Sequence, residues 1–174
     1  MYCTVLQLME WHTPERLVAI TPAKAPHNRY LVTPALLRKV ATGEDVTGED
    51  VEAVAATHTV VEKLLTAIST ASQEADGYLL RRYGTRMQDK VFIDQLRDET
   101  ILPERVGGIA IERLAIGSDQ ETEQVTRLAV DARRWLREVA DAKVELGIQS
   151  TQVRATQDYS HTQQTRSRID WGTY

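Results

Sequence analysis

Apolar side chains recur every three or four residues between Val51 and Leu79, and the series stops at Gly84. This spacing places them on one face of an α-helix. The part from residue 59 to residue 83 alone would be on the order of 37 Å long. We therefore expect one long helix that forms the spine of a small domain. Its inward positions are Val54, Val61, Leu64, Leu65, Ile68, Ala71, Ala75, Tyr78 and Leu79.

A second long helix is predicted nearer the C-terminus. Ser118 and Glu121 are spaced as in a capping box, in which the serine caps the first turn and the glutamate reaches back to the cap. Gly147 is a natural residue to end this helix, so we expect it to run to about Leu146. Its inward apolar residues are Val125, Leu128, Ala132, Trp135, Leu136 and Val139.

A short helix is predicted at the very start of the chain. Thr4 is a good N-cap residue, and the helix that it opens would run through Trp11. The apolar residues Val5, Leu6 and Met9 would face inward.

Two further short helices follow. Pro14 suits the first turn of a helix that reaches about Ile20. Residues 21–32 contain two prolines and are expected to form a loop. Thr33-Pro34 then pairs a cap with a proline at the first helical position, and this helix should stop at Gly43.

The pattern is weaker between the two long helices. An apolar group from Val91 to Leu96 indicates a short helix or an irregular segment. Pro103 is expected to open another helix that carries isoleucines and leucines. Gly107-Gly108 weakens this prediction, because glycine is about 1 kcal/mol less favourable than alanine inside a helix.

The pentapeptide TGEDV occurs twice in succession, at 42–46 and 47–51. Four carboxylates in a short segment raise the possibility of calcium binding. The spacing does not suit it, because an EF-hand loop needs oxygen ligands at alternate positions and a glycine at the sixth. We interpret the repeat as a solvated acidic turn, with Thr47 capping the long helix and Asp50 in its first turn.

The composition changes after Gly147. Half of residues 149–174 are Ser, Thr or Gln, and such a segment buries too little apolar surface to offset its ordering entropy. We therefore divide the chain into a helical domain, 1–147, and an extended polar tail, 148–174. A frayed terminus is one interpretation of the tail. A binding tail is the other, because Arg, Trp and Tyr are enriched at interface hot spots. The candidate partner-binding residues are Arg166, Arg168, Ile169, Trp171 and Tyr174.

The remaining features exclude several classes of function. A net charge of −4 in 174 residues argues against a nucleic-acid binder that is basic throughout. The arginine pair at 81–82 and the arginines between 133 and 137 are interpreted as solvated or ion-paired faces. Cys3 stands too close to the terminus for a rigid nucleophile, and the four histidines are scattered. We expect no enzyme activity, no cofactor, no metal site and no membrane segment.

Three segments, in order, resemble a known family. The start MYCTVLQL is similar to the opening M-Y-x-T-x-x-x-L of the phage Mu-type neck proteins. Residues 71–83 resemble their A-S-x-E-I-D-G-Y-L-x-x-R-Y signature, and residues 132–147 resemble their closing A-x-x-W-L-x-x-V-A-x-G-K-x-x-L-G. Ala75 and Ala142 depart from the usual Ile and Gly. The matching motif residues are Asp76, Gly77, Tyr78, Leu79, Arg82, Tyr83, Trp135, Leu136, Lys143 and Gly147.

This resemblance implies an all-α fold, a small helical bundle with two long helices and several short ones, and a role as a head–tail connector. Such proteins form a ring, typically of twelve copies, beneath the portal protein of a DNA-filled head. The ring extends the DNA channel, lies close to genomic DNA and offers a platform for the next neck or tail protein. Related connectors often dock on the portal through an extended C-terminal segment. The implied location is the virion neck, and the host cytoplasm during assembly.

A helical DNA-binding protein with a packaging or regulatory role is the alternative. It is motivated by the helical content and the arginine groups. Tight DNA binding with a steep salt dependence would favour it, since each phosphate contact releases counterions.

Overall fold

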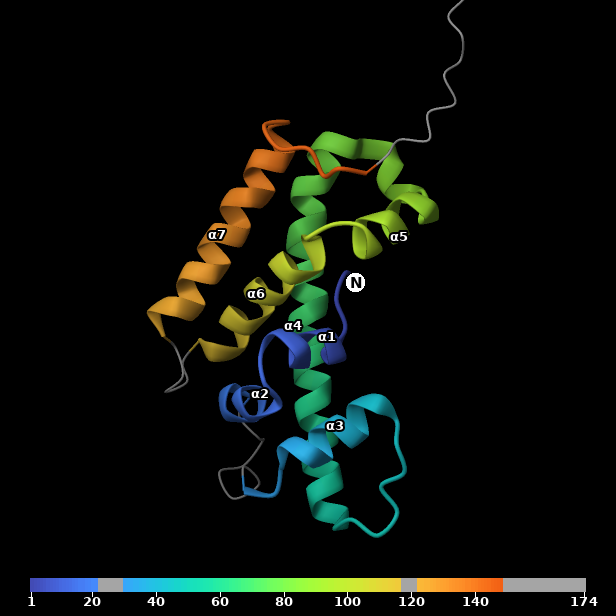
Figure 1. Cartoon of the computed structure of the whole chain (residues 1–174), viewed down its shortest axis with the longest axis vertical. Helices are drawn as coiled ribbons and strands as arrows, with labels where there is room; N and C mark the ends of the chain where they lie inside the picture. The colour runs from blue at the N-terminus through green and yellow to red at the C-terminus, as the bar shows by residue number, and fades with distance from the viewer. Residues whose placement is uncertain (22–29, 117–121, 149–174) are drawn as a thin grey trace, which may run out of the picture.

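The long helix α4 (Val51–Tyr83) organises the fold. The computed structural model describes residues 1–21, 30–116 and 122–148. The 33 residues of α4 correspond to about 50 Å of helix, and α4 runs the length of the molecule in Figure 1. Gly84 follows it with a positive φ of 49°. The prediction of a spine helix that stops at Gly84 is confirmed.

The N-cap of α4 lies three residues beyond the predicted cap. Asp50, not Thr47, is the N-cap, and its carboxylate accepts a hydrogen bond from the Ala53 N–H at 3.1 Å. The Thr47 N–H instead donates to the Asp45 carboxylate at 2.8 Å, and the Thr47 hydroxyl donates to the same oxygen. The prediction was wrong because a local bond within the acidic turn competes with capping.

The first three helices confirm the predicted boundaries. They are α1 (Val5–Trp11), α2 (Pro14–Ile20) and α3 (Pro34–Thr42). Thr4 forms a capping box with Gln7, and the Thr33 hydroxyl caps α3. Within the loop predicted at 21–32, residues 22–29 lie outside the described residues.

The inward face of α1 differs from the prediction by one residue. Val5, Leu8 and Met9 are buried, whereas Leu6 is 40% exposed. Positions 5, 8 and 9 are related by steps of three and four and so share one helical face. Leu6 points away from that face.

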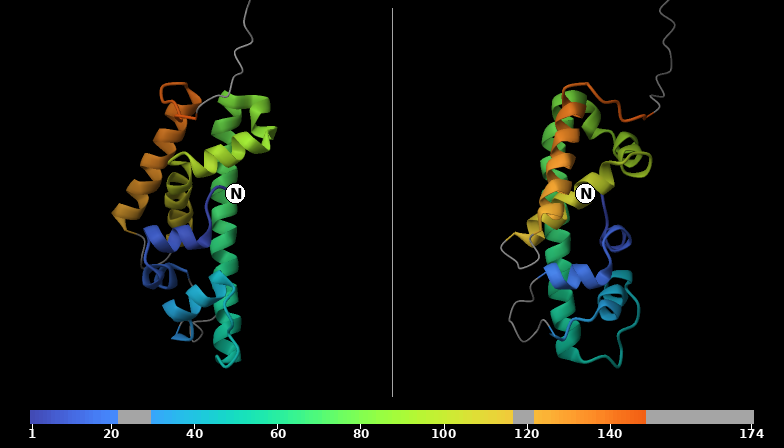
Figure 2. Two further views of the ribbon diagram at one scale, coloured as in Figure 1. Left: turned by 45° about the vertical axis from the view of Figure 1, so that its right-hand side comes forward. Right: turned by 60° about the vertical axis from the view of Figure 1, so that its left-hand side comes forward.

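The second half of the chain folds back along α4. It contains η2 (Gly84–Gln88), α5 (Lys90–Asp98), α6 (Leu102–Ala115) and α7 (Glu123–Ala140). Helices α4, α6 and α7 contact one another, while α3 packs on α4 nearer its start. The three views show α6 and α7 side by side along the C-terminal half of α4 (Figures 1 and 2).

A single apolar core joins these helices. On α4 it includes Leu64, Ile68, Ala71 and Leu79, which are fully buried, whereas the predicted inward residue Leu65 is 39% exposed. All seven α-helices found in the described residues contribute side chains to this core or pack against it. The predicted all-α fold is confirmed. Among the described residues, no helix combines the length and the apolar character that crossing a membrane requires.

One glycine of the pair in α6 has a packing role. A Cβ at Gly107 would lie 3.0 Å from the Trp11 ring, whereas one at Gly108 would make an ordinary contact, 3.7 Å from the carbonyl oxygen of Leu128. Gly107 therefore lets α1 approach the α6 backbone closely. This gain offsets the low helix propensity that weakened the sequence prediction.

Helix α7 is shorter than predicted at its end. The Lys143 N–H donates to the Glu138 carbonyl at 2.8 Å, and the Ala142 N–H donates to the Val139 carbonyl at 3.1 Å. These two bonds form a Schellman motif, with Ala142 in the left-handed region at φ 58°. The helix therefore ends at Ala140, and Gly147 follows in an irregular segment.

The start of α7 also differs from the sequence prediction. The predicted cap Ser118 and the rest of its capping box lie outside the described residues. Thr122 is the N-cap, and its side chain accepts a hydrogen bond from the Val125 N–H at 3.4 Å.

The left-handed alanine yields a stability prediction. An L side chain in this conformation costs roughly 1–2 kcal/mol, which glycine avoids. We expect Ala142→Gly to raise the free energy of unfolding by about 1 kcal/mol, measured by urea denaturation. Ala140→Gly, in the last helical turn of α7, is the matched control and should lower it by about 1 kcal/mol. Loss of stability in Ala142→Gly would contradict the assigned cap.

Candidate docking site at the end of the long helix

Residues 72–76 of α4 hold the N-terminus of the chain. The Tyr2 N–H donates to the Ser72 hydroxyl oxygen at 3.1 Å, and the Tyr2 hydroxyl donates to the Asp76 carboxylate. Tyr2 is buried. Burial, together with the hydrogen bond to Asp76, raises the pKa of the Tyr2 hydroxyl, so it stays a protonated donor. The motif aspartate therefore fastens the N-terminal segment to the spine.

Glu74 lies at the centre of an ionic network that joins three helices. Its carboxylate accepts from Arg113 of α6 at 2.8 Å and from Arg133 of α7 at 2.6 Å. Arg133 also reaches Glu112 of α6 at 2.7 Å. Burial alone would raise the pKa of Glu74, but the hydrogen bonds from Arg133 and Arg113 outweigh it and lower the pKa.

Arg82 ties the end of α4 to the segment after α7. Its guanidinium donates to the Val139 carbonyl at 3.0 Å and also to the Val144 carbonyl. The last carbonyls of a helix have no partner within the helix and carry partial negative charge, so a cation is well placed there. The motif arginine thereby fixes the path along which the chain leaves the domain.

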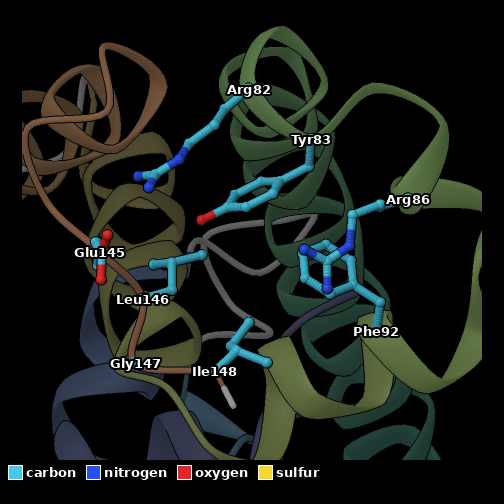
Figure 3. A pocket seen from close by; sticks show the side chains of 8 residues that line it. All are labelled: Arg82, Tyr83, Arg86, Phe92, Glu145, Leu146, Gly147 and Ile148. Carbon is cyan, nitrogen blue, oxygen red and sulfur yellow. The ribbon is translucent and has the colours of Figure 1, made fainter. Parts of the chain in front are cut away.

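A pocket of about 220 Å³ lies between the exit segment, residues 141–148 after α7, and the end of α4 (Figure 3). Tyr83 and Phe92 have ring centroids 5.0 Å apart, and the Arg86 guanidinium lies 4.4 Å from the centre of the Phe92 ring. Leu146 and Ile148, which also line the pocket, pack against the apolar core. The pocket is lined by Arg82, Tyr83, Arg86, Phe92, Glu145, Leu146, Gly147 and Ile148.

This arrangement suits anchoring of the C-terminal segment. Ile148, the first residue of the tail, is also the last described residue, and it lines the pocket at the end of α4. The candidate tail contacts Arg166, Arg168, Ile169, Trp171 and Tyr174 lie outside the described residues. The structure shows where the tail begins. Arg82 and the apolar side chains of the exit segment hold this point in place.

The motif residues fall into a buried group and a surface group. Leu79 and Leu136 are fully buried, and Tyr78 and Trp135 pack against the core while half-buried. Their predicted core role is confirmed. The exposed Gly77 has open space where a Cβ would lie, so nothing in the fold requires glycine there.

Two further motif residues lie close to the exit segment. The Lys143 ammonium lies 3.6 Å from the Asp141 carboxylate at the surface. Gly147 adopts a φ of 70° as the exit segment passes the pocket, and open space again surrounds its Cβ position. This conformation favours glycine, since other residues rarely adopt it.

The partners of these motif residues were not predicted from the sequence. Glu112, Arg86 and Phe92 complete the network and the pocket, yet they belong to none of the three matching segments. The only available signal was Glu74 itself, a carboxylate near the inward face of a helix, which needs cations from other elements.

The described residues offer little for catalysis. No group of three or more His, Cys, Asp or Glu side chains among them is placed to hold a metal ion. Burial raises the pKa of the Cys3 thiol to about 12, so the reactive thiolate is scarce near neutral pH.

Removing the Arg82 guanidinium should loosen the exit segment. We expect Arg82→Gln to lower the free energy of unfolding by about 1–3 kcal/mol, because two carbonyls lose a charged donor. Hydrogen exchange should become faster at the amides of Ala142 and Lys143. The control is Arg81→Gln, whose 72% exposed side chain pairs with Asp141 at 3.2 Å and should matter by less than about 1 kcal/mol. Equal effects of the two variants would refute the anchoring role of Arg82.

The Glu74 network should make stability depend on pH. The pKa of this carboxyl is lower in the folded than in the unfolded protein, so its contribution is present above the unfolded value and is lost as pH falls through the folded value. Glu74→Gln should be less stable than the unaltered protein at pH 6 by about 1–3 kcal/mol, measured by urea denaturation. This difference should shrink below about pH 4.5, the ordinary value of the group. Glu62→Gln, an exposed site on the same helix, should change little at either pH.

Comparisons with known proteins bear on the identity of the chain. The comparisons with curated proteins and with solved structures gave no match. Residues 2–164 match the family described as Bacteriophage Mu, Gp36. The matched range includes Tyr2, Asp76 and Arg82 and continues beyond Ile148, where the described residues end. The chain therefore belongs to this phage protein family, as the resemblance to Mu-type phage proteins predicted.

Proposed function

We propose that this phage protein is a head–tail connector. Copies of the chain, typically twelve, form a ring beneath the portal, extend the DNA channel and present a platform to the next neck or tail protein. Residues 1–147 are the ring subunit, and residues 148–174 are a tail that docks on the portal. This proposal places the protein in the virion neck, after assembly in the host cytoplasm.

The fastening of the exit segment by Arg82 carries the proposal. A docking tail must transmit load to a rigid body, and here its origin is bonded to the spine helix and to the end of α7. Leu146 and Ile148 add apolar contacts with the core at the same place. An unanchored terminal segment would instead be free to fray from its first residue.

The ionic network favours this proposal over DNA binding. Arg113 and Arg133 are neutralised by Glu74 and Glu112, so these cations are engaged within the subunit. The net charge of −4 also suits a channel through which DNA must slide, because each phosphate contact adds affinity.

A ring of identical copies also fits the tail. Each copy would contribute one docking segment, so contacts that are individually weak add up once several are engaged. Ordering a polar segment on binding costs several kcal/mol, and multiple copies offset this cost. The aromatic and arginine residues at the end of the tail are the expected contacts.

Deleting residues 149–174 tests the role of the tail. We expect the truncated protein to keep its helical circular dichroism spectrum and cooperative melting, because the described core lies before residue 149. It should be absent from purified DNA-filled heads, counted by quantitative mass spectrometry. Trp171→Ala and Tyr174→Ala should lower its copy number, whereas Thr162→Ala, within the same tail, should not. A truncated protein that still joined heads to tails would contradict the docking role.

A further inference from the structure

A second cleft, of about 320 Å³, lies away from the exit segment, where α1, α2, α6 and α7 meet. Three of its lining side chains can carry positive charge, namely His12, Arg16 and Arg105. Glu104 is the one carboxylate among the residues that line it. The cleft is therefore built to receive negative charge.

Arg105 has an unmet hydrogen-bonding requirement. Its Nε is buried and has no hydrogen-bond partner within the described part of the chain. An unpaired buried polar group costs about 1–3 kcal/mol, and more when it is charged. Neither Arg105 nor Arg16 forms an ion pair with a described residue, in contrast to Arg113 and Arg133. Two guanidinium groups in one cleft thus have no ion-pair partner among the described residues, although Glu104 lines the same cleft.

The positive charge of the cleft comes from its two arginines. Burial, and next the charge of Arg16, lowers the pKa of His12, although Glu104 partly opposes this shift, so His12 adds little charge near neutral pH. Trp11 and Leu128 line the same cleft and are each 37% exposed. Tryptophan and arginine together are typical of protein interface hot spots.

The acidic turn of the same chain offers complementary charge. Glu44 and Glu52 are exposed and form no ion pair with a described residue, whereas Glu49 is paired with Lys39 at 2.7 Å. The turn lies at the lower right of Figure 1, across α4 from α7 and α6, which line the cleft. A subunit that carries a basic cleft and an acidic turn in different places can join its copies head to tail, which is the contact type that closes a ring.

We infer that the cleft lined by Arg16 and Arg105 receives the acidic turn, residues 44–52, of a neighbouring copy of this chain. The inference rests on the proposed ring and names one of its subunit interfaces. The carboxylates of Glu44 and Glu52 pair with the two guanidinium groups. Trp11 and Leu128 exclude water at the edge of the contact, which strengthens the ion pairs.

Charge reversal tests the interface. Phage that lack their own copy of the gene are supplied with full-length variants, and the copies of this protein per purified particle are counted. Arg105→Glu and, separately, Arg16→Glu should lower the copy number at least about tenfold, because each leaves like charges facing one another. The double change Glu44→Lys with Glu52→Lys should restore assembly in the background of the double variant Arg16→Glu with Arg105→Glu, in which both ion pairs are reversed. Glu62→Lys, an exposed carboxylate of α4 outside the turn, is the control and should assemble normally.

The outcomes separate this inference from the proposed function. If the unaltered protein forms a ring but Arg16→Glu, folded by circular dichroism, assembles normally, the interface is wrong and the connector remains. Failure of the lysine pair to rescue the double arginine variant also overturns the interface. If the unaltered protein is absent from particles, the connector proposal fails and the interface fails with it.

Crosslinking gives a second measurement that does not depend on charge reversal. Cysteines placed at Arg16 and Glu44 of the full-length chain should be joined between copies by a short bismaleimide in assembled particles. The products should form a ladder on denaturing gels. Cys3 is buried and its pKa is raised to about 12, so it should contribute little background. A ladder no stronger than that given by cysteines at Arg16 and Glu62 would overturn the proposed contact.

Discussion

A single helix of 33 residues needs partners along its whole length, and this requirement shapes the rest of the molecule. Helix propensity alone contributes little to the stability of an isolated helix, and α4 contains several β-branched threonines, which have low helix propensity. The hydroxyls of Thr57, Thr66 and Thr70 donate to carbonyls four residues earlier, so they are satisfied within the helix. Stability must come from burial of the apolar face. The chain meets this need in two halves, with α3 near the start of α4 and α6 and α7 along its end.

Residues 72–82 of α4 hold the other segments in their positions around the helix. Ser72 and Asp76 hold the N-terminus, Glu74 holds α6 and α7, and Arg82 holds the segment after α7. Burial by apolar side chains alone allows helices to slide or rotate, because it is not directional. Hydrogen-bonded charges do not, since a displaced partner leaves an unpaired group behind. The three sequence motifs are therefore parts of one set of contacts, although up to 74 residues separate the bonded positions.

The sequence was sufficient where the signal was local. The caps Thr4 and Thr33 and the stops Gly43 and Gly84 are each determined by a few neighbouring residues, and these four helix ends were predicted correctly. The end of α7 was misplaced because its Schellman motif uses Ala142, which carries no sequence signal for a left-handed residue. The inferred interface could not have been found from the chain alone. It depends on which arginines find a carboxylate in the fold, and the ion pairs of Arg113 and Arg133 join different helices.

The difference between arginines that are paired inside the domain and those that are not bears on both proposed contacts of the subunit, the ring interface and the docking tail. Arginines that lie between helices, such as Arg82 and Arg133, form their hydrogen bonds with groups inside the domain and make it rigid. Arg105, at the edge of the helices, has a buried nitrogen with no hydrogen-bond partner among the described residues, and this lowers the stability of an isolated subunit. A rigid body with an unsatisfied edge gains most from a neighbour whose charge complements it. A polar tail gains most from a partner that orders it. Ring formation and tail docking then draw on separate parts of the chain, so one can occur without rearranging the other.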